Sequence, residues 1–480
     1  MSVERQHYAV TLAILTVAAT AYAVQQTLVF PALPTLQREF GTSAAWVTWV
    51  MTAFLLSASV LTPIFGKLGD RFGKERLLVV SLCLFLAGSL GAAAAPDLWT
   101  LIAFRVVSGA GGAVFPLSFG IIRDEFPPER VKVGIGLLSA VFGVGSGLGL
   151  IVSGLVIDNL SWRWLFIIGA APVALVIVVV RRFVPESPVR SLTRLDVPGA
   201  ALLSGALISL LLALTEGERW GWTSSRIIGL LGVAAALAGV WIVVELRSEH
   251  PMVDMRLMTQ RSILLTNVTA VISGFALFGS FILVPQYVES PRGLPGDISR
   301  LVDYGFGATA TRAGLLLLPS SAMMLFAGPV AGVLGRRFGS KWPLAAGMAL
   351  NAAGAAMLAH WNSRPWQIAV AMLALGIGIG FSFAAMAALI TENVPITETG
   401  VATGMNTVMR TVGGVIGAQV AAAVLTASTI PGTDVPSRAG FDQAFMLAAG
   451  AAAIGAVVGL FVTRFRPRGR HSVSLAIEND

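Results

Sequence analysis

The sequence predicts an all-α polytopic membrane protein with two six-helix bundles plus two extra helices. Composition, the length of the apolar stretches and an internal repeat are the three observations that predict this fold class. Of the 480 residues, 55% are hydrophobic and only 12% are charged, and the mean hydropathy is +0.80. Soluble proteins carry about twice that share of charged residues. The long apolar stretches are therefore expected to face lipid.

Fourteen apolar stretches are long enough to cross a bilayer as helices, since about 20 apolar residues span its hydrocarbon core. The predicted spans are 8–30, 44–66, 77–95, 99–122, 133–157, 162–181, 198–215, 225–245, 263–288, 310–333, 342–360, 366–391, 401–426 and 441–463. The first span contains Ala21-Tyr22-Ala23, which also fits a signal-peptide cleavage site. We favour a retained helix, because the helix array needs a first member.

Lysine and arginine are distributed unequally between the two sides of the predicted array. An even number of spans places both termini on one side. The segments on that side carry 22 Lys and Arg residues and the segments on the other side carry 9, while Arg105 and Arg410 lie inside helices. Lys and Arg accumulate on the cytoplasmic side, so we expect a multi-pass protein of the inner (plasma) membrane with cytoplasmic termini. The same bias accounts for the net charge of +8 without a nucleic-acid partner.

The sequence contains an internal repeat with a constant offset. "GKLGDRFGKERLL" at 66–78 has a weaker copy, "GVLGRRFGSKWPL", at 332–344, which is an offset of 266 residues. The same offset relates Gly134 to Gly400, at the start of two later spans. Duplicated six-helix units explain a shared offset, and two parallel six-helix repeats are the plan of major facilitator transporters.

The repeat predicts three parts of the chain. Residues 1–181 form an N-terminal six-helix bundle, and residues 182–255 form a link with the two inserted helices. Residues 256–480 form a C-terminal six-helix bundle with a cytoplasmic tail.

The segment between the second and third spans holds the pattern G-x-x-x-D-R-x-G. Gly66 and Gly73 permit a tight turn and close helix approach. Asp70, followed by Arg71, is expected at a helix end, paired with a cation across the two halves so that the pair latches one conformation. The alternative is a plain positively charged loop. In the copy, Arg336 replaces Asp70, so the second loop keeps the turn without the carboxylate.

The fourth span, "LIAFRVVSGAGGAVFP", contains an arginine about six residues from its start. An arginine within a membrane helix is costly and marks function. The alternative for Arg105 is a side chain that snorkels to the outer surface. Gly109 follows one turn later, and Asp124 lies just beyond the helix at its cytoplasmic end.

Several motifs together resemble the QacA/EmrB-type drug/proton antiporters, the fourteen-helix branch of the major facilitator superfamily. They are the fourteen spans, the loop 66–76, the R-x-x-x-G pattern at Arg105 and Gly109, "SWRWLF" at 161–166 and "TVMRTVGGVIGA" at 407–418. The resemblance covers essentially the whole chain. It implies the major facilitator fold and proton-linked efflux of small molecules, as in multidrug resistance, with Asp70, Arg105 and their motifs in coupling and gating.

The sequence departs from this family in its first span. Family members commonly have L-D-x-T-V-V-N-x-A-L-P there, with an aspartate implicated in protons or cationic drugs. The run in this chain is "VQQTLVFPALP", so Gln25 stands at the aspartate position and Phe30 at the asparagine position. In the fifth span, Leu148 replaces the proline of the antiporter signature, which puts its kink in doubt.

No acidic residue is predicted near the middle of a span. All 25 fall in loops, tails or terminal helical turns, and the peripheral candidates to carry a proton are Asp70, Asp124, Glu245, Glu289 and Glu392. Arg410 instead lies about nine residues into its span, or roughly 14 Å, near the centre of a hydrocarbon core about 30 Å thick. The expected substrate is therefore anionic or neutral and aromatic, with Arg410 as its counter-charge. The alternative is a strut in which Arg410 bonds backbone carbonyls.

Further residues are expected to line the substrate path. Neutral hydrogen bonds would come from Gln25, Gln26, Asn351 and Asn406, and aromatic walls from Phe30 and Phe278. If the substrate carries its own titratable acid, no carboxylate at the midplane is needed for coupling. Alternatively, the Asp70 and Asp124 region relays protons at the cytoplasmic face.

Other classes of function find little support. The single cysteine excludes a disulfide framework or a thiolate cluster, no Walker A pattern exists, and the four histidines are scattered. We expect a monomer in the lipid bilayer that is not an enzyme and has no cofactor or metal, with a small-molecule substrate and protons as partners. A lipid flippase on the same fold and a non-transporting membrane sensor remain as alternatives.

Overall fold

The computed structural model is helical throughout the part of the chain that it describes. The described residues are 8–29, 32, 35–36, 39–42, 44–184, 186, 196–249, 251–290, 302, 304–430 and 436–463. Within them, fourteen helices are long and apolar enough to cross a membrane, and the β-structure consists of one isolated bridge. The predicted fold class and the fourteen spans are confirmed. Phe30, residues 291–301 and 303, and the C-terminal tail from residue 464 lie outside the described residues.

The helices of the first half begin after a short N-terminal segment. They are α1 (Tyr8–Thr27), α3 (Ala44–Phe72), α4 (Lys74–Ala93), α5 (Leu98–Ser108), α6 (Val114–Glu125), α7 (Pro128–Asn159) and α8 (Arg163–Phe183). The fourth predicted span is divided, because the 3-10 segment η1 (Gly109–Ala113) joins α5 to α6. Asp97 begins α5 by accepting hydrogen bonds from the amide and hydroxyl of Thr100, and these bonds lower the pKa of the exposed Asp97 carboxyl.

The second half follows the two inserted helices. The inserted pair is α9 (Val197–Trp220) and α10 (Ser225–Arg247), and the short α11 (Met255–Met258) comes next. The remaining elements are α12 (Arg261–Glu289), α13 (Ala310–Phe338), α14 (Lys341–His360), α15 (Pro365–Asn393), η2 (Ile396–Glu398), α16 (Thr399–Ala427) and α17 (Arg438–Leu460).

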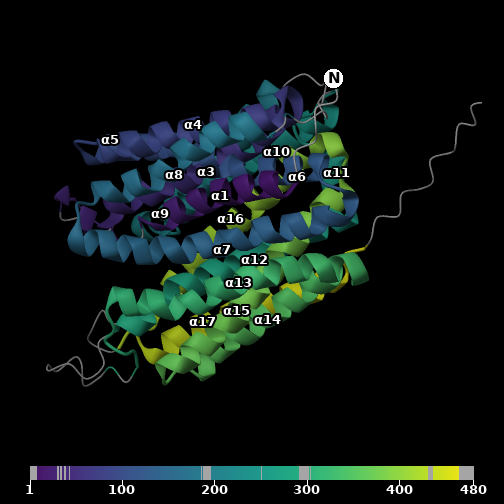
Figure 1. The fold of residues 1–480 in the computed structure, drawn as a ribbon. Helices are drawn as coiled ribbons and strands as arrows, with labels where there is room; N and C mark the ends of the chain where they lie inside the picture. Colours follow the sequence, from purple (N-terminus) through teal and green to yellow (C-terminus); the bar gives the residue numbers. More distant parts are fainter. Residues whose placement is uncertain are drawn as a thin grey trace, which may run out of the picture.

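The two halves form separate helical bundles with separate cores. Figure 1 shows the N-terminal helices, in purple and blue, stacked on the C-terminal helices, in green and yellow. One hydrophobic cluster draws its buried residues from 270–462, whereas two others draw theirs from 14–184, with Ala387 as the one exception. Each bundle thus buries its own apolar surface. The residue boundaries of the three parts stay a prediction.

The repeated glycines lie where the two bundles meet. A Cβ atom on Gly66 of α3 would lie 2.5 Å from the carbonyl oxygen of Gly400 in α16. A Cβ atom on Gly332 of α13 would lie 2.6 Å from the carbonyl oxygen of Lys132 in α7. Small residues let helix backbones approach this closely. The duplicated motif therefore builds two matching seams, one between α3 and α16 and one between α7 and α13.

The segment predicted as a loop at 66–76 is mostly helical. Helix α3 continues to Phe72, and α4 begins at Lys74, so Gly73 alone separates them. Gly73 has φ 115, and Gly339 at the same place in the copy has φ 96. A side chain would strain this backbone, whereas glycine lets the chain reverse within one or two residues.

The inserted helices cover the outside of one seam. Helix α9 packs against α10 and touches both α3 and α16. Leu203 and Leu207 share a hydrophobic cluster with Val401 and Met405 of α16. Toward the other end of α9, the indole Nε1 of Trp49 in α3 donates to the Glu216 carboxylate at 2.9 Å. The insert therefore contacts both halves along the α3–α16 seam.

Candidate functional site

A small cavity lies between the two bundles at the level of Arg410. Helices α6, α7, α15 and α16 supply its lining, which is Phe115, Phe119, Ser139, Phe383, Ala387, Thr403, Asn406, Thr407 and Arg410. Its volume is about 20 Å3, which is room for about one water molecule. The lining combines one guanidinium, three aromatic rings and four neutral polar side chains. No lining residue is acidic.

Arg410 is the charged residue of this cavity. Its guanidinium carbon lies 4.2 Å from the centroid of the Phe383 ring, within the range of a cation–π contact. Because the side chain is only half-buried, Arg410 can reach a molecule in the cavity. The structure thus places the predicted counter-charge where both bundles meet.

Asn406 is the second predicted residue that lines the cavity. It lies one turn before Arg410 on α16, and its amide nitrogen donates to the side-chain oxygen of Asn267 in α12 at 3.0 Å. The structure brings these two residues together. Sequence reasoning missed Phe115, Phe119 and Phe383 of the lining, since an aromatic residue in an apolar helix looks the same whether it faces a cavity, a neighbouring helix or lipid.

The other predicted substrate-binding residues lie away from this cavity. Gln25 and Gln26 are buried within the N-terminal bundle. Asn351 of α14 packs against α15, and Phe278 of α12 packs against Gly414 of α16. None of the four belongs to the lining. Phe30 lies outside the described residues, so its predicted role stays a prediction.

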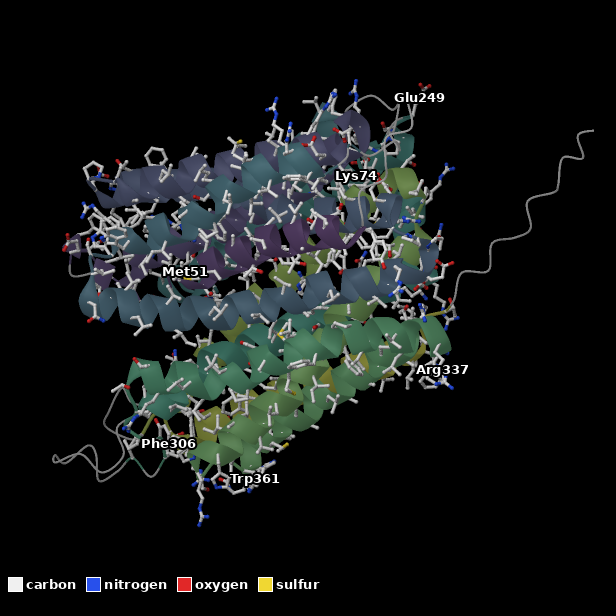
Figure 2. All side chains as sticks on the ribbon, in the orientation of Figure 1. Met51, Lys74, Glu249, Phe306, Arg337 and Trp361 are labelled. Carbon is white, nitrogen blue, oxygen red and sulfur yellow. The ribbon has the colours of Figure 1, made fainter. Side chains whose placement is uncertain are left out.

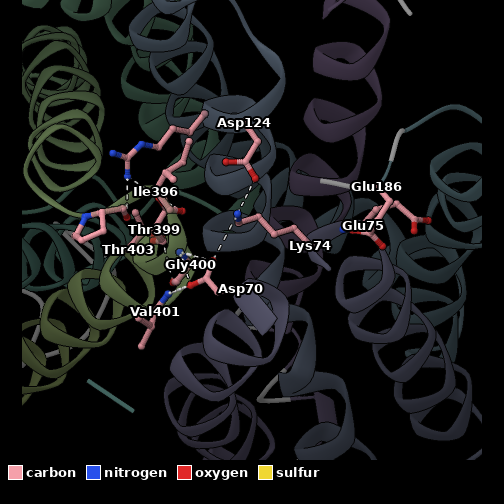
Figure 3. A network of polar contacts seen from close by, with 12 residues as sticks. Asp70, Lys74, Glu75, Asp124, Glu186, Ile396, Thr399, Gly400, Val401 and Thr403 are labelled. Carbon is pink, nitrogen blue, oxygen red and sulfur yellow. Dashed lines mark hydrogen bonds and ion pairs between the residues drawn. The ribbon is translucent and has the colours of Figure 1, made fainter. Parts of the chain in front are cut away.

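Asp70 connects the two bundles at one end of the molecule. Its buried carboxylate accepts hydrogen bonds from the backbone amides of Gly400, at 3.1 and 3.3 Å, and Val401, at 3.3 Å (Figure 3). These amides begin α16, where free N–H groups and the helix dipole favour an anion. In place of the expected cation, the partner of Asp70 across the two halves is therefore a helix N-terminus.

A buried lysine joins Asp70 to Asp124. The Lys74 ammonium lies 2.6 Å from the Asp124 carboxylate and 3.6 Å from the Asp70 carboxylate, and all three side chains are fully buried (Figure 3). The Lys74 ammonium thus pairs with both carboxylates, and the Asp70 carboxylate also faces the N-terminus of α16. The two predicted coupling carboxylates thus belong to one network. Loss of one partner from a buried ion pair costs about 3–5 kcal/mol.

Two further bridges join the bundles at the same end. Arg123 of α6 donates to the Thr399 hydroxyl at 2.5 Å and to the Val394 carbonyl at 2.7 Å. Lys132 of α7 forms an ion pair with Glu392 of α15 at 2.8 Å. Sequence reasoning missed Arg123 as a bridge, because a basic residue at a cytoplasmic helix end is also what the charge bias alone predicts.

We call this end of the molecule the Asp70 end. In Figure 2, Lys74 and Arg337 lie at the Asp70 end, and Phe306 and Trp361 lie at the opposite end. The contacts of Asp70, Arg123 and Lys132 join the two bundles at the Asp70 end.

The remaining predicted coupling residues have other surroundings. The Arg71 guanidinium carbon lies 4.9 Å from the centroid of the Phe72 ring. Gly109 lets η1 approach α3, since a Cβ atom there would lie 2.6 Å from the side chain of Ser57. Arg105 is fully buried, and its Nε donates to the Val50 carbonyl at 3.0 Å. Burial inside the bundle excludes the snorkelling alternative for Arg105.

Replacing Gly66 with alanine should hold the Asp70 end open. The added methyl group would meet the backbone of Gly400, and overpacking of this kind costs about 1–3 kcal/mol. Thr407→Cys places a thiol in the cavity lining, and Cys83→Ser removes the native cysteine. In this background, an impermeant thiol reagent applied from the Asp70 end should react about tenfold faster when Gly66 is alanine than when it is glycine. Gly229→Ala is the control, because its methyl group would meet open space. Equal rates for the two variants would refute the close-approach role of Gly66.

The sequence matches the family model of the Major Facilitator Superfamily twice, over residues 15–302 and 268–478. Among curated proteins, it is 29% identical to the tetracenomycin C resistance and export protein of Streptomyces glaucescens, over 72% of this chain and 62% of that protein. It is 33% identical to the multidrug resistance protein B homolog of Mycobacterium tuberculosis (strain ATCC 25618 / H37Rv), over 69% of this chain and 59% of that protein. The chain thus spans about three fifths of the length of these two relatives.

A third relative is covered more fully. The chain is 31% identical to the methylenomycin A resistance protein of Streptomyces coelicolor, over 72% of this chain and 70% of that protein. These names match the drug-export family that the sequence motifs resemble.

Two solved structures have the same fold at low sequence identity. The proton:xylose symporter XylE superposes with a TM-score of 0.65 at 14% identity, covering 95% of each chain. The human organic anion transporter MFSD10 superposes with a TM-score of 0.63 at 14% identity, covering 94% of this chain and 99% of that one. The family is one of transporters rather than enzymes. With both its sequence and its fold matched over most of its length, the chain belongs to the Major Facilitator Superfamily.

Proposed function

We propose that the chain is a secondary active, proton-linked exporter of small amphipathic or aromatic molecules that are anionic or neutral. The observation that carries this proposal is the cavity, in which Arg410 lies among three phenylalanine rings and no lining residue is a carboxylate. An aromatic acid would find both a counter-charge and apolar walls there. A lipophilic cation would meet the positive charge of Arg410 instead.

Transport on this fold requires that the cavity open to each side in turn. The present cavity holds about one water molecule, so a substrate enters when the bundles move apart. The two bundles are proposed to move as 1–181 and 256–480, while 182–255 covers the α3–α16 seam. The charge bias of the loops supports cytoplasmic termini, and therefore a cytoplasmic Asp70 end in the plasma membrane.

Asp70 is the proposed proton carrier at the Asp70 end. Its negative charge attracts the amides that begin α16, and protonation would remove that attraction. A proton arriving from outside would thus favour opening toward the cytoplasm. Release of the proton to the cytoplasm and binding of substrate would complete the exchange. Lys74 and Asp124 supply the neighbouring sites for a relay.

The relatives support export more than the alternatives. Their names refer to export of, or resistance to, tetracenomycin C and methylenomycin A, and to multidrug resistance. A flippase would need a lateral opening between helices, whereas close glycine contacts fill both seams and α9 covers one of them. A sensor would not need a cavity shared by both bundles.

Accumulation of matched substrates tests the proposal directly. In an efflux-deficient bacterium, cells that express the protein should retain less of a set of aromatic acids than cells with an empty vector. A protonophore should abolish that difference, because the export depends on the proton gradient. Matched lipophilic cations should accumulate equally in both strains. Export of the cations and not the acids would overturn the predicted charge of the substrate, and export that survives the protonophore would overturn the coupling.

A further inference from the structure

The N-terminal bundle encloses a positive charge that the transport cycle described above does not use. Arg105 of α5 is 0% exposed. Its Nε donates to the Val50 carbonyl, but both terminal nitrogens, Nη1 and Nη2, are buried without a hydrogen-bond partner. Within the described part of the chain, no carboxylate forms an ion pair with it. Its guanidinium carbon lies 4.0 Å from the centroid of the Phe54 ring.

A second unsatisfied side chain lies in the same interior region. Gln25 of α1 is also 0% exposed, and both its amide oxygen and its amide nitrogen lack a partner. It packs against Gly169 of α8, and one turn earlier on α8 the ring of Phe166 lies 5.9 Å from the Arg105 guanidinium. Tyr22, one turn before Gln25, stacks on the Phe54 ring that Arg105 contacts. Both unsatisfied groups thus lie between α1, α3, α5 and α8.

The chemistry of these groups favours an anion. Two guanidinium NH2 groups and one amide NH2 group present donors, and one of the two side chains carries a full positive charge. An unpaired charge in a low-dielectric interior is costly unless an opposite charge or several dipoles compensate it. Water can satisfy the hydrogen bonds, but only an anion also neutralises the charge.

We propose that a small monovalent anion, of the size and charge of chloride, binds between the Arg105 guanidinium and the Gln25 amide. A small ion fits better than a substrate acid group, because Arg105 is enclosed and does not line the cavity at Arg410. This site is independent of the proposed export function.

Thermal unfolding of the purified protein in lipid nanodiscs tests the site. Sodium chloride is compared with sodium gluconate at the same ionic strength, about 0.15 M. A ligand that binds the folded state raises the unfolding midpoint, and we expect a shift of about 2–4 °C in chloride. Bromide should act like chloride and give an anomalous diffraction peak beside Arg105 in crystals. Equal midpoints in chloride and gluconate would overturn the proposal.

Three variants assign the effect to its residues. Gln25→Asp places a carboxylate beside the guanidinium, so it should unfold at the same midpoint in chloride and in gluconate. Arg105→Gln removes the charge and should also abolish the shift; if it does not fold, Gln25→Asp still decides. Arg410→Gln should keep the full shift, because Arg410 is not part of the proposed anion site. A chloride shift that survives Gln25→Asp, or one that disappears in Arg410→Gln, would refute the assignment.

Discussion

Replacing Arg410 with alanine should greatly reduce export of aromatic acids. The guanidinium is the charged group among the residues that line the cavity, so its loss leaves an anionic substrate without a counter-charge in an apolar surrounding. Truncation of one partner of a buried charge pair costs about 2–5 kcal/mol. Transport measured as kcat/KM should therefore fall by roughly 100-fold. Uptake into inverted vesicles, driven by an imposed proton gradient, measures this ratio.

Two controls separate charge from structural support. Arg410→Lys keeps the charge but loses the planar contact with Phe383, so it should retain more acid transport than the alanine variant. Arg337→Ala removes an exposed arginine at the Asp70 end and should transport normally. If Arg410→Lys is as inactive as Arg410→Ala and both have lowered unfolding midpoints, Arg410 is a strut rather than a counter-charge.

Replacing Asp70 with asparagine should release the Asp70 end. An asparagine side chain can still accept a hydrogen bond from the first amides of α16. The substitution removes the negative charge, however, and with it the electrostatic attraction to those amides and to Lys74. An anion at a partly buried helix N-terminus is worth up to about 2 kcal/mol. We therefore expect the population with an open Asp70 end to rise about 10- to 30-fold, and proton-driven transport to be lost.

Thiol labelling of Thr407→Cys, in the background without Cys83, reports this opening. The impermeant reagent should reach the cavity from the Asp70 end much faster in Asp70→Asn than in the parent. Asp97→Asn is the matched control, because Asp97 also sits at a helix N-terminus but is exposed and caps only its own helix. If the labelling rate of Thr407→Cys is the same in Asp70→Asn as in the parent, the contacts of Arg123 and Lys132 keep the Asp70 end closed without the Asp70 charge.

The motif glycines show how far sequence reasoning reaches. The repeat at an offset of 266 residues predicted matching elements in two halves, and the structure places both copies at helix seams. The turn at Gly73 was also predictable, since a glycine between charged residues is typical of one. That the surrounding segment is helix rather than loop was not predictable, because helix ends extend past the apolar core into water.

The candidate site was only partly predictable. Arg410 stood out in the sequence because an arginine in the middle of an apolar span is rare, and the structure places it in the cavity with Asn406. Gln25, Gln26 and Asn351 also stood out as polar residues in apolar spans, yet they lie elsewhere. A polar residue in a span shows that a partner or cavity is needed, but not which helix supplies it.

The sequence by itself determined the membrane class, the number of spans, the duplication and the unusual arginines. These follow from local quantities: the length of an apolar run, the sign of nearby charges and the spacing of glycines. Only the tertiary structure decided what closes the Asp70 end, because the partner of Asp70 lies 330 residues away. That partner is the backbone of Gly400 and Val401. Every residue except proline has a backbone N–H group, so the residue types in a sequence do not reveal which free amides at a helix start will bind a carboxylate.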